Sequence, residues 1–472
     1  MTKVFTTVMP DKIGAFLNAA EILSELKLNI LRVSYNKAVD STMLFIEVSG
    51  DEDALDKAEQ RLIKEGYIKG SLTGENVVLL EFYLKDKPGA LLPVLSVINE
   101  FNFNISYINA VSRGEEKQNF KMGLLISDEE KFKVFLQRVK KLCPVSVIDY
   151  NKSEKALDNT VFYVSFVNDI SERTGLSDGE KRELLINSNL IMQLLEERNL
   201  PPYEVFGYIG KFSEYINKYK GENYNPRITH IDELSLTVIE PPCGSNIMVF
   251  DLGERLLFAD AGFNCYKKEL FNVLEKEIPG FKNKERELLL THSDVDHIGF
   301  LDEFQKVYLS ENTAINLINV SSGKKGYREE IISHYPYVRI SKILSGYKYP
   351  SCRNFSIIGG KQSNSLMSFI GTLDFDKLHF EVYEGSGGHI KGETVYIERS
   401  KRFVLTGDIY INIKDCIAPQ EEFNKIAPYL LASVDTEPEL AGKVRREIKP
   451  LLDKGRWLIL GGHGAPCYWN VY

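Results

Sequence analysis

Several features that mark common protein classes are absent from this sequence of 472 residues. No apolar run approaches the roughly 18 residues that a membrane-spanning helix needs, so no membrane partner is expected. The opening "MTKVFTTVMPDKIGAF" contains no signal-peptide core, and we therefore expect a cytoplasmic protein. No CxxC pair occurs, which argues against disulfides and cysteine-bound zinc for the six scattered cysteines Cys143, Cys243, Cys265, Cys352, Cys416 and Cys467.

Positive charge is not concentrated anywhere in the chain either. The net charge is −8 and no basic block occurs, so a nucleic acid is not an expected partner. The hydrophobic share of 43% and the charged share of 26% are typical of a globular protein. Because 472 residues are too many for one ordinary core, we expect two to four domains.

An internal repeat occupies residues 1–150. Each copy contains a predicted strand, a D-K-x-G turn, an amphipathic helix, a strand that begins at an Asn-Ile pair, and then a strand, a helix and a closing strand. This βαββαβ order is that of a ferredoxin-like unit, and we predict two such units over residues 1–72 and 76–150. The matching positions are 75 residues apart: Asp11 and Asp86, Lys12 and Lys87, Gly14 and Gly89, Ala15 and Ala90, Asn29 and Asn104, Ile30 and Ile105.

The repeated unit resembles the ACT domain, a small regulatory module that often binds amino acids. The D-x-P-G-x-L turn of that family is present as residues 86–91, whereas Ile13 and Phe16 replace its proline and leucine in the first copy. The resemblance implies an amino-acid effector whose carboxylate meets backbone N–H groups at the glycine turns. The candidate ligand residues are Asp11, Gly14, Asn29, Asp86, Gly89 and Asn104. The alternative is that the glycines only permit tight turns and the pair is a dimerisation scaffold. A homo-oligomer is expected.

A helical connector is predicted over residues 151–227. Ser177 and Glu180 form a capping box before "LLINSNLIMQLLEERN", and Pro201-Pro202 ends that helix. A second, aromatic-rich helical pattern follows. Its apolar stripe is expected to pack against a neighbouring domain and consists of Phe206, Ile209, Phe212 and Ile216.

From about residue 228, short apolar runs repeatedly end in aspartate or histidine, and four of the seven histidines lie at these ends. The runs are "RLLFADAGF" with Asp260, "ELLLTHSDVDH" with His292, Asp294, Asp296 and His297, "EGSGGHIKGETVYIE" with His389, "RFVLTGDIY" with Asp408, and "RWLILGGHGAP" with His463. Strands that share one sheet edge would bring these ends together, and imidazoles with carboxylates suit a borderline divalent metal. For any one of these residues alone, a polar cap is the competing interpretation.

Residues 230–472 resemble the metallo-β-lactamase superfamily. The H-x-H-x-D-H signature stands as residues 292–297, followed by G-H-x-x-G at 388–392, T-G-D at 406–408 and G-H-G at 462–464. The resemblance implies an αββα sandwich over residues 228–472 with two divalent ions, zinc first and iron or manganese as alternatives. It implies that His292, Asp294 and His389 hold one ion, that Asp296, His297 and His463 hold the other, and that Asp408 bridges them. Asp260 would orient a ligand rather than bind an ion itself.

Asp294 departs from the family pattern, because most members carry a histidine at this position. A harder oxygen ligand moves the site toward iron or manganese. Some members, among them the flavodiiron proteins, also carry a carboxylate here, but this chain has no flavodoxin-like half to supply electrons. The alternative is that Asp294 weakens the first site and leaves a mononuclear centre.

The resemblance leaves three functions open. The first is a metallohydrolase in which Asp296 or Asp408 handles the proton of a metal-activated water and an amino acid at the ACT pair tunes activity. Its substrate would be a small ester, thioester, lactone or phosphodiester, and Tyr410 is a candidate proton donor. The alternatives are a diiron oxidoreductase or oxygen-handling protein on the same ligands, and a non-enzymatic metal-containing sensor. The insert at about residues 311–378 is expected to decide specificity, and its basic group from Gly323 to Arg328 is expected to be a solvated loop.

Overall fold

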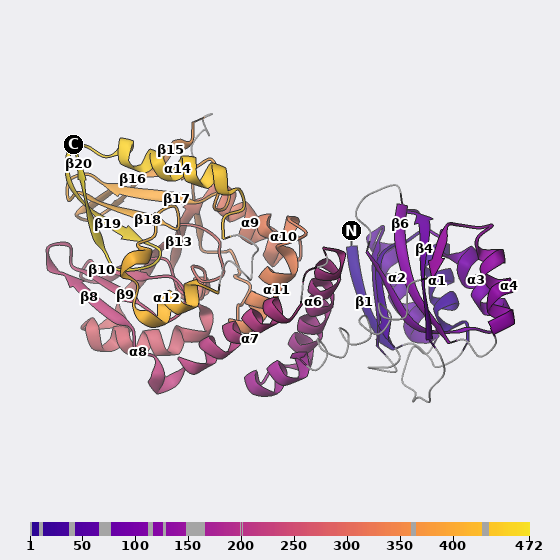
Figure 1. Cartoon of the computed structure of the whole chain (residues 1–472). Helices are drawn as coiled ribbons and strands as arrows, with labels where there is room; N and C mark the ends of the chain where they lie inside the picture. The colour runs from indigo at the N-terminus through magenta and orange to yellow at the C-terminus, as the bar shows by residue number, and fades with distance from the viewer. Residues whose placement is uncertain are drawn as a thin grey trace. The chain divides into compact units, whose positions relative to one another are not determined.

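The computed structural model describes residues 2–8, 13–36, 43–65, 77–111, 117–125, 129–147, 166–198, 200, 202–359, 365–426 and 434–472. The chain divides into two compact units, one of residues 1–169 with 188–202 and the other of residues 170–187 with 203–472. Both combine helices with β-sheets (Figure 1). The predicted α+β architecture with several sheets is confirmed, whereas the domain limits at 1–72, 76–150, 151–227 and 228–472 stay predictions.

The smaller unit contains one seven-stranded antiparallel sheet in the order β1-β3-β2-β5-β6-β4-β7. Its two halves meet through the pair β2–β5, where Ser34 lies opposite Asn109. The strands are β1 (Thr2–Val8), β2 (Asn29–Asn36), β3 (Met43–Ser49), β4 (Val77–Lys85), β5 (Asn104–Val111), β6 (Lys117–Leu125) and β7 (Val145–Val147).

Four helices accompany this sheet: α1 (Ala15–Glu25), α2 (Glu52–Lys64), α3 (Leu92–Glu100) and α4 (Glu129–Val139). In the second copy, β4-α3-β5-β6-α4-β7 follow the βαββαβ order that the sequence predicts. The described residues of the first copy hold β1-α1-β2-β3-α2, and its predicted closing strand lies outside them. Helix α1 buries Phe16 and Leu23, and α3 buries Val94 and Ile98, in one core with the sheet. In both helices, the apolar residues at helical spacing therefore form the buried face.

The predicted capping box of the connector is confirmed at the start of α6 (Asp178–Glu197), where Ser177 N donates to Glu180 Oε2 at 2.9 Å. Glu180 N donates in turn to Ser177 Oγ at 3.4 Å. In α7 (Pro202–Lys218) the predicted apolar stripe is buried, and the Phe212 ring lies 5.4 Å from the ring of Phe423 in the same unit. The stripe therefore packs inside the larger unit, to which it belongs, and the expected contact with a neighbouring domain stays a prediction.

The larger unit contains two mixed sheets. The first, in the order β14-β13-β12-β11-β10-β9-β8, is parallel from β11 to β14 and antiparallel from β8 to β11. Its strands are β8 (Arg227–Ile231), β9 (Leu236–Glu240), β10 (Ile247–Asp251), β11 (Arg255–Ala259), β12 (Glu285–Leu289), β13 (Lys306–Ser310) and β14 (Phe355–Ile358). The second runs from β15 to β20 in sequence order: β15 (Met367–Phe375), β16 (Leu378–Gly385), β17 (Thr394–Glu398), β18 (Phe403–Gly407), β19 (Gly455–Gly461) and β20 (Cys467–Val471).

The two sheets pack face to face, and helices cover their outer faces (Figure 1). Between the sheets, Phe250 of the first meets Phe380 and Phe403 of the second. The outer face of the first sheet is covered by α8 (Lys267–Glu277) and α9 (Glu311–Ser321), and that of the second by α14 (Pro438–Leu451). Strands β9, β17 and β18 are buried on both faces, which explains their continuous apolar runs. Among the described residues, no helix combines the length and apolarity needed to cross a membrane.

Candidate metal centre

The strand ends singled out in the sequence converge at one edge of the two-sheet unit. Asp260 follows β11, and residues 290–297 follow β12. His389 precedes β17, Asp408 follows β18, and His463 follows β19. Parallel pairing of β11 with β12 and of β18 with β19 places these ends side by side. The predicted convergence is therefore present.

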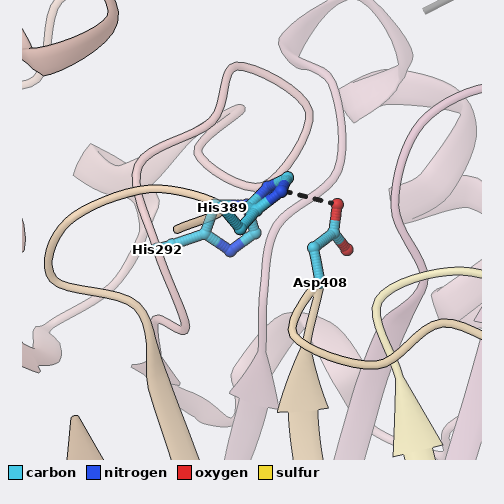
Figure 2. Close-up of side chains that lie close together, drawn as sticks. All are labelled: His292, His389 and Asp408. Atoms are coloured by element: carbon cyan, nitrogen blue, oxygen red, sulfur yellow. Dashed lines mark ion pairs between the residues drawn. The ribbon is translucent and has the colours of Figure 1, made fainter. Parts of the chain in front are cut away.

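The converging side chains form two groups that could each hold an ion. The first group is His292, His389 and Asp408, and the second is Asp296, His297 and His463; the ligand atoms within each lie within 4.8 Å of one another. Figure 2 shows the first group, in which His389 Nε2 lies 3.7 Å from Asp408 Oδ2. Asp408 also lies 3.4 Å from His297 Nε2 and 3.5 Å from His463 Nε2. Asp408 therefore lies between the two groups, where a bridging ligand would lie.

Buried atoms without partners test whether these residues fit a metal. His292 Nε2, His297 Nε2 and Asp408 Oδ1 are buried and have no hydrogen-bond partner in the described part of the chain. Leaving such an atom unpaired costs about 1–3 kcal/mol, so a bound group is expected to compensate it. A Cβ on Gly462 would lie 2.1 Å from Asp408 Oδ1, so the chain leaves space beside this oxygen. Imidazole nitrogens with carboxylate oxygens suit zinc, iron or manganese, and the residues present fit a divalent ion.

Asp260 supports the second group without belonging to it. Its carboxylate is hydrogen-bonded to His297 Nδ1 at 2.8 Å and accepts from the backbone N–H of Thr291 at 2.9 Å. Because a carboxylate accepts, Nδ1 carries a proton, and Nε2, the nitrogen that points to the group, is the atom available to an ion. Asp260 therefore lies where it could orient His297, and its role beside a bound ion stays a prediction.

Two further carboxylates that the sequence analysis missed play similar parts. Asp435 Oδ1 lies 3.0 Å from His389 Nδ1, and the buried Glu393 accepts from the backbone N–H of Asp408 at 2.8 Å. Glu393 Oε1 also lies 3.5 Å from His292 Nδ1. Glu393 directly precedes β17, a strand that is buried on both faces, which is a signal that a charged residue there has a specific partner. No comparable signal marks Asp435, which precedes α14 in a polar loop.

Asp294 reaches the first group but is also held by an arginine. Its Oδ2 lies 3.1 Å from His389 Nε2 and 3.7 Å from His292 Nε2. Arg328 donates from Nε to Oδ1 and from Nη2 to Oδ2, each at 2.6 Å. Burial alone would raise the pKa of Asp294, but Arg328, His292 and His389 together outweigh burial and hold the pKa well below its usual value. Whether Asp294 also binds an ion stays a prediction.

The expectation of a solvated basic loop is wrong for Arg328. Its side chain is 5% exposed and lies in the short helix α10 (Tyr327–Glu330). The reason is the partly buried carboxylate of Asp294, which pairs with the guanidinium through two hydrogen bonds. The partner lies 34 residues away in sequence, so local composition could not identify it.

The site carries more carboxylates than cations, and the ionisation of its histidines reflects this excess. Burial lowers the pKa of His297, yet Asp408, Asp260 and Asp296 together raise it well above its usual value. For Asp408, burial is outweighed by His463 and His297, and its pKa is well below its usual value. An environment that stabilises a protonated histidine also favours a metal cation in its place.

A pocket of about 600 Å³, part of it open to solvent, adjoins the centre. Asp294, Asp296 and Arg328 form part of its wall, and the insert supplies most of the rest through α9, α10 and α11 (Tyr335–Leu344). The wall includes the apolar side chains Ile298, Leu317, Val320, Val338 and Ile390. The pocket therefore offers an apolar surface beside the metal-binding groups.

Tyr410 is placed away from this pocket. Its hydroxyl lies 3.9 Å from Cys467 Sγ, and its ring packs edge-on against Trp469 with 4.6 Å between centroids. Because Tyr410 is a packed aromatic, its role as a proton donor is not supported.

The candidate effector residues of the smaller unit lie at two related pockets. One is lined by Asn29 of the first copy with Gly89 of the second, and the other by Gly14 of the first with Asn104 of the second. Gly14 and Gly89 have φ angles of 79° and 76°, which favour glycine. Asn29 Nδ2 donates to Asp86 Oδ1 at 2.8 Å. Asp11 lies outside the described residues. Effector binding at these positions stays a prediction.

Comparisons with known proteins give solved structures of the metallo-β-lactamase superfamily that cover about half of this chain. Neither a family model nor a curated protein matches the sequence. A metallo-β-lactamase family protein from Thermus thermophilus is 14% identical over 51% of this chain and 73% of its own, with a TM-score of 0.35. An archaeal superfamily protein from Sulfolobus tokodaii is 15% identical over 49% and 80%, and the B3 metallo-β-lactamase BLEG-1 is 18% identical over 49% and 93%, each with a TM-score of 0.30. The candidate metal centre rests on the side-chain geometry described above.

Proposed function

We propose that this protein is a metal-dependent hydrolase of the metallo-β-lactamase superfamily. One observation carries the proposal: histidines and aspartates from separate strand ends form two adjoining groups, and the nitrogens and oxygen at their centre are buried without partners among the described residues. A structural role for these polar side chains would require those atoms to be hydrogen-bonded. A divalent ion bound among them would satisfy these atoms.

Bound ions and the aspartates of the two groups would have different roles in hydrolysis. When bound, divalent ions would lower the pKa of a bound water toward roughly 7 and polarise the carbonyl or phosphoryl oxygen of the substrate. Asp296 belongs to the second group and also lines the pocket, with 19% of its side chain exposed. It can therefore orient the attacking water and take up its proton. Asp408, with 10% exposed, lies deeper between the groups and is the alternative proton acceptor.

The pocket supports a substrate with an apolar portion. Its charged side chains are already paired, because Arg328 bonds Asp294, and Lys342 Nζ donates to Glu329 Oε1 at 2.8 Å. What remains for recognition is the apolar wall formed by α9, α11 and Ile390. Esters, thioesters and lactones that carry an alkyl or aryl group fit this wall better than a negatively charged phosphodiester does.

The pairing of Asp294 with Arg328 favours hydrolysis over the redox alternative. The diiron interpretation depends on Asp294 as a hard anionic ligand to iron. Both of its oxygens are instead bonded to Arg328. The nitrogen ligands His292, His297, His389 and His463 then dominate, a set that zinc accepts well.

Regulation by an amino acid belongs to the same proposal. The two pockets of the smaller unit each combine a glycine turn of one copy with the Asn of the other, so a ligand there would contact both copies. The N–H groups near Gly14 and Gly89 can donate to a carboxylate, and the effector's side chain can pack against the neighbouring leucines. A homo-oligomer formed through this unit remains part of the proposal.

Elemental analysis of protein purified without added metal, followed by a screen of generic ester, thioester, lactone and phosphodiester substrates, tests the proposal. Changing His297 or His463 to Ala is expected to lower bound metal and to abolish turnover, because each offers a nitrogen to the second group. His379→Ala is the matched control, since His379 is 58% exposed and pairs with Asp374 on the surface. Wild-type protein without metal, or full turnover in both site variants, would refute the proposal.

A further inference from the structure

The guanidinium of Arg328 lies beside His389 Nε2, a nitrogen that an ion in the first group would bind. Its Nη2 lies 3.3 Å from His389 Nε2, the nitrogen that also faces Asp408 Oδ2 at 3.7 Å. A metal–nitrogen bond is roughly 2.0–2.1 Å long, so an ion on this nitrogen would lie close to the guanidinium. The guanidinium cannot give up its proton, and its positive charge therefore opposes a second cation there.

The second group differs from the first in this respect. In the described part of the chain, the ion pairs of Asp296 are with His297 and His463 alone. Asp260 adds a further carboxylate behind His297, whereas the first group contains Arg328 within hydrogen-bond distance of both Asp294 and His389. The two groups share similar ligands but differ by one fixed positive charge.

Arg328 is fixed by the helix that carries it. The backbone N–H of Tyr327 donates to Asn316 Oδ1 at 2.7 Å, and Asn316 Nδ2 donates to Ser293 Oγ at 2.5 Å, beside Asp294. Gly326 N donates to Glu329 Oε2 at 3.0 Å. These bonds connect α10 to α9 and to the metal-ligand loop itself. The position of the guanidinium is therefore built into the insert.

We propose that Arg328 takes the charge-compensating place of an ion at the first group, so that the protein holds one ion tightly, at Asp296, His297 and His463, and binds a second only weakly. Asp294 is then the counter-ion of Arg328 and an incomplete metal ligand. The inference rests on the proposed function for the second group, and it makes the insert the element that decides how many ions are bound.

The test measures retained zinc in the full-length protein. Wild type and variants are loaded with Zn²⁺, dialysed against a weak chelator and analysed by mass spectrometry for zinc per chain. Wild type is expected to retain one ion and R328M two, with the second ion bound at least about tenfold more tightly than in wild type. R328M removes the guanidinium and frees both oxygens of Asp294. The double variant R328M/D294N is expected to return to one ion, because the freed carboxylate is then gone.

Lys342→Met is the matched control for loss of a buried cation in the same pocket. Lys342 pairs with Glu329, so its loss is expected to leave zinc retention at the wild-type value. If R328M does not fold, R328Q replaces it, since its neutral amide removes the positive charge but can still donate a hydrogen bond to Asp294, and the second ion should again bind more tightly. Two equally retained ions in wild type, or unchanged retention in the folded Arg328 variant, would overturn the inference and leave the proposed function standing. No retained ion in wild type would overturn both.

Discussion

At the residue scale, Asp260 combines an unfavourable backbone conformation with a hydrogen bond that orients His297. Its φ angle of 57° lies in the left-handed region, which aspartate adopts more readily than most residues but still seldom. The same turn lets its carboxylate receive Thr291 and His297 at once. A strained backbone at a buried acidic residue is typical of functional sites, where the surroundings hold the conformation in place.

Replacing Asp260 with Asn tests this role, because asparagine tolerates the left-handed region and keeps the size of the side chain. The variant loses the charge that fixes the proton on His297 Nδ1. We expect metal affinity at the second group to fall about 10–100-fold with little change in thermal stability. Competition with a chromophoric chelator measures the affinity, and an unchanged value would show that Asp260 serves the fold alone.

Gly462 allows a second test at the same scale. A Cβ there would lie 2.1 Å from Asp408 Oδ1 and 3.0 Å from His297 Cε1. Gly462→Ala is therefore expected to displace Asp408 and to reduce bound metal. Gly442→Ala is the control, because Gly442 lies in α14 with Arg446 Nη1 at 3.8 Å as its near neighbour, and alanine favours a helix. Equal metal content in both variants would contradict the assignment of Asp408.

The candidate ligand residues could be predicted from the sequence better than the residues around them. His292, His297, His389, Asp408 and His463 could be identified because each ends or precedes an apolar run, and that pattern is local. Arg328 and Asp435 could not, since they lie 34 and 46 residues from the side chains they contact. Tertiary packing alone brings such pairs together, and it also decided that Tyr410 is a packed aromatic.

At the element scale, the glycine turns of the smaller unit bring the two copies into close approach. A Cβ at Gly89 would lie 2.8 Å from Ser24 Oγ in α1 of the other copy, and one at Gly14 would lie 2.6 Å from Asn99 Oδ1 in α3. The repeat and the helix spacing were predictable from sequence. The cross-copy contacts were not, because they depend on how α1 and α3 meet.

Thermal denaturation in the presence of each proteinogenic amino acid tests whether these turns bind an effector. At millimolar concentration, at least one amino acid is expected to raise the melting temperature, and Gly89→Ala is expected to remove the effect by filling the turn. Gly253→Ala is the control, since Gly253 has a φ of 91° but no atom within 4 Å of an added Cβ. A flat response of the wild type would leave the repeat pair as an association scaffold.

At the scale of the whole molecule, the candidate metal centre is a consequence of the layer order in the larger unit. The two sheets bury a common core, and their parallel strand pairs place Asp260 with the 290–297 loop and Asp408 with His463. The sequence predicted that these strand ends converge. It could not give the register of one strand against the next, which decides that Asp408 lies between the two groups.

A crystal structure with anomalous scattering recorded at the zinc edge tests the central claim most directly. We predict a strong anomalous peak roughly 2.0–2.2 Å from Nε2 of His297, from one ring nitrogen of His463 and from one carboxylate oxygen of Asp296. At His292 and His389 a weaker peak or none is expected while Arg328 bonds Asp294. No peak near either group in zinc-soaked crystals, with the histidines hydrogen-bonded to one another instead, would contradict the account.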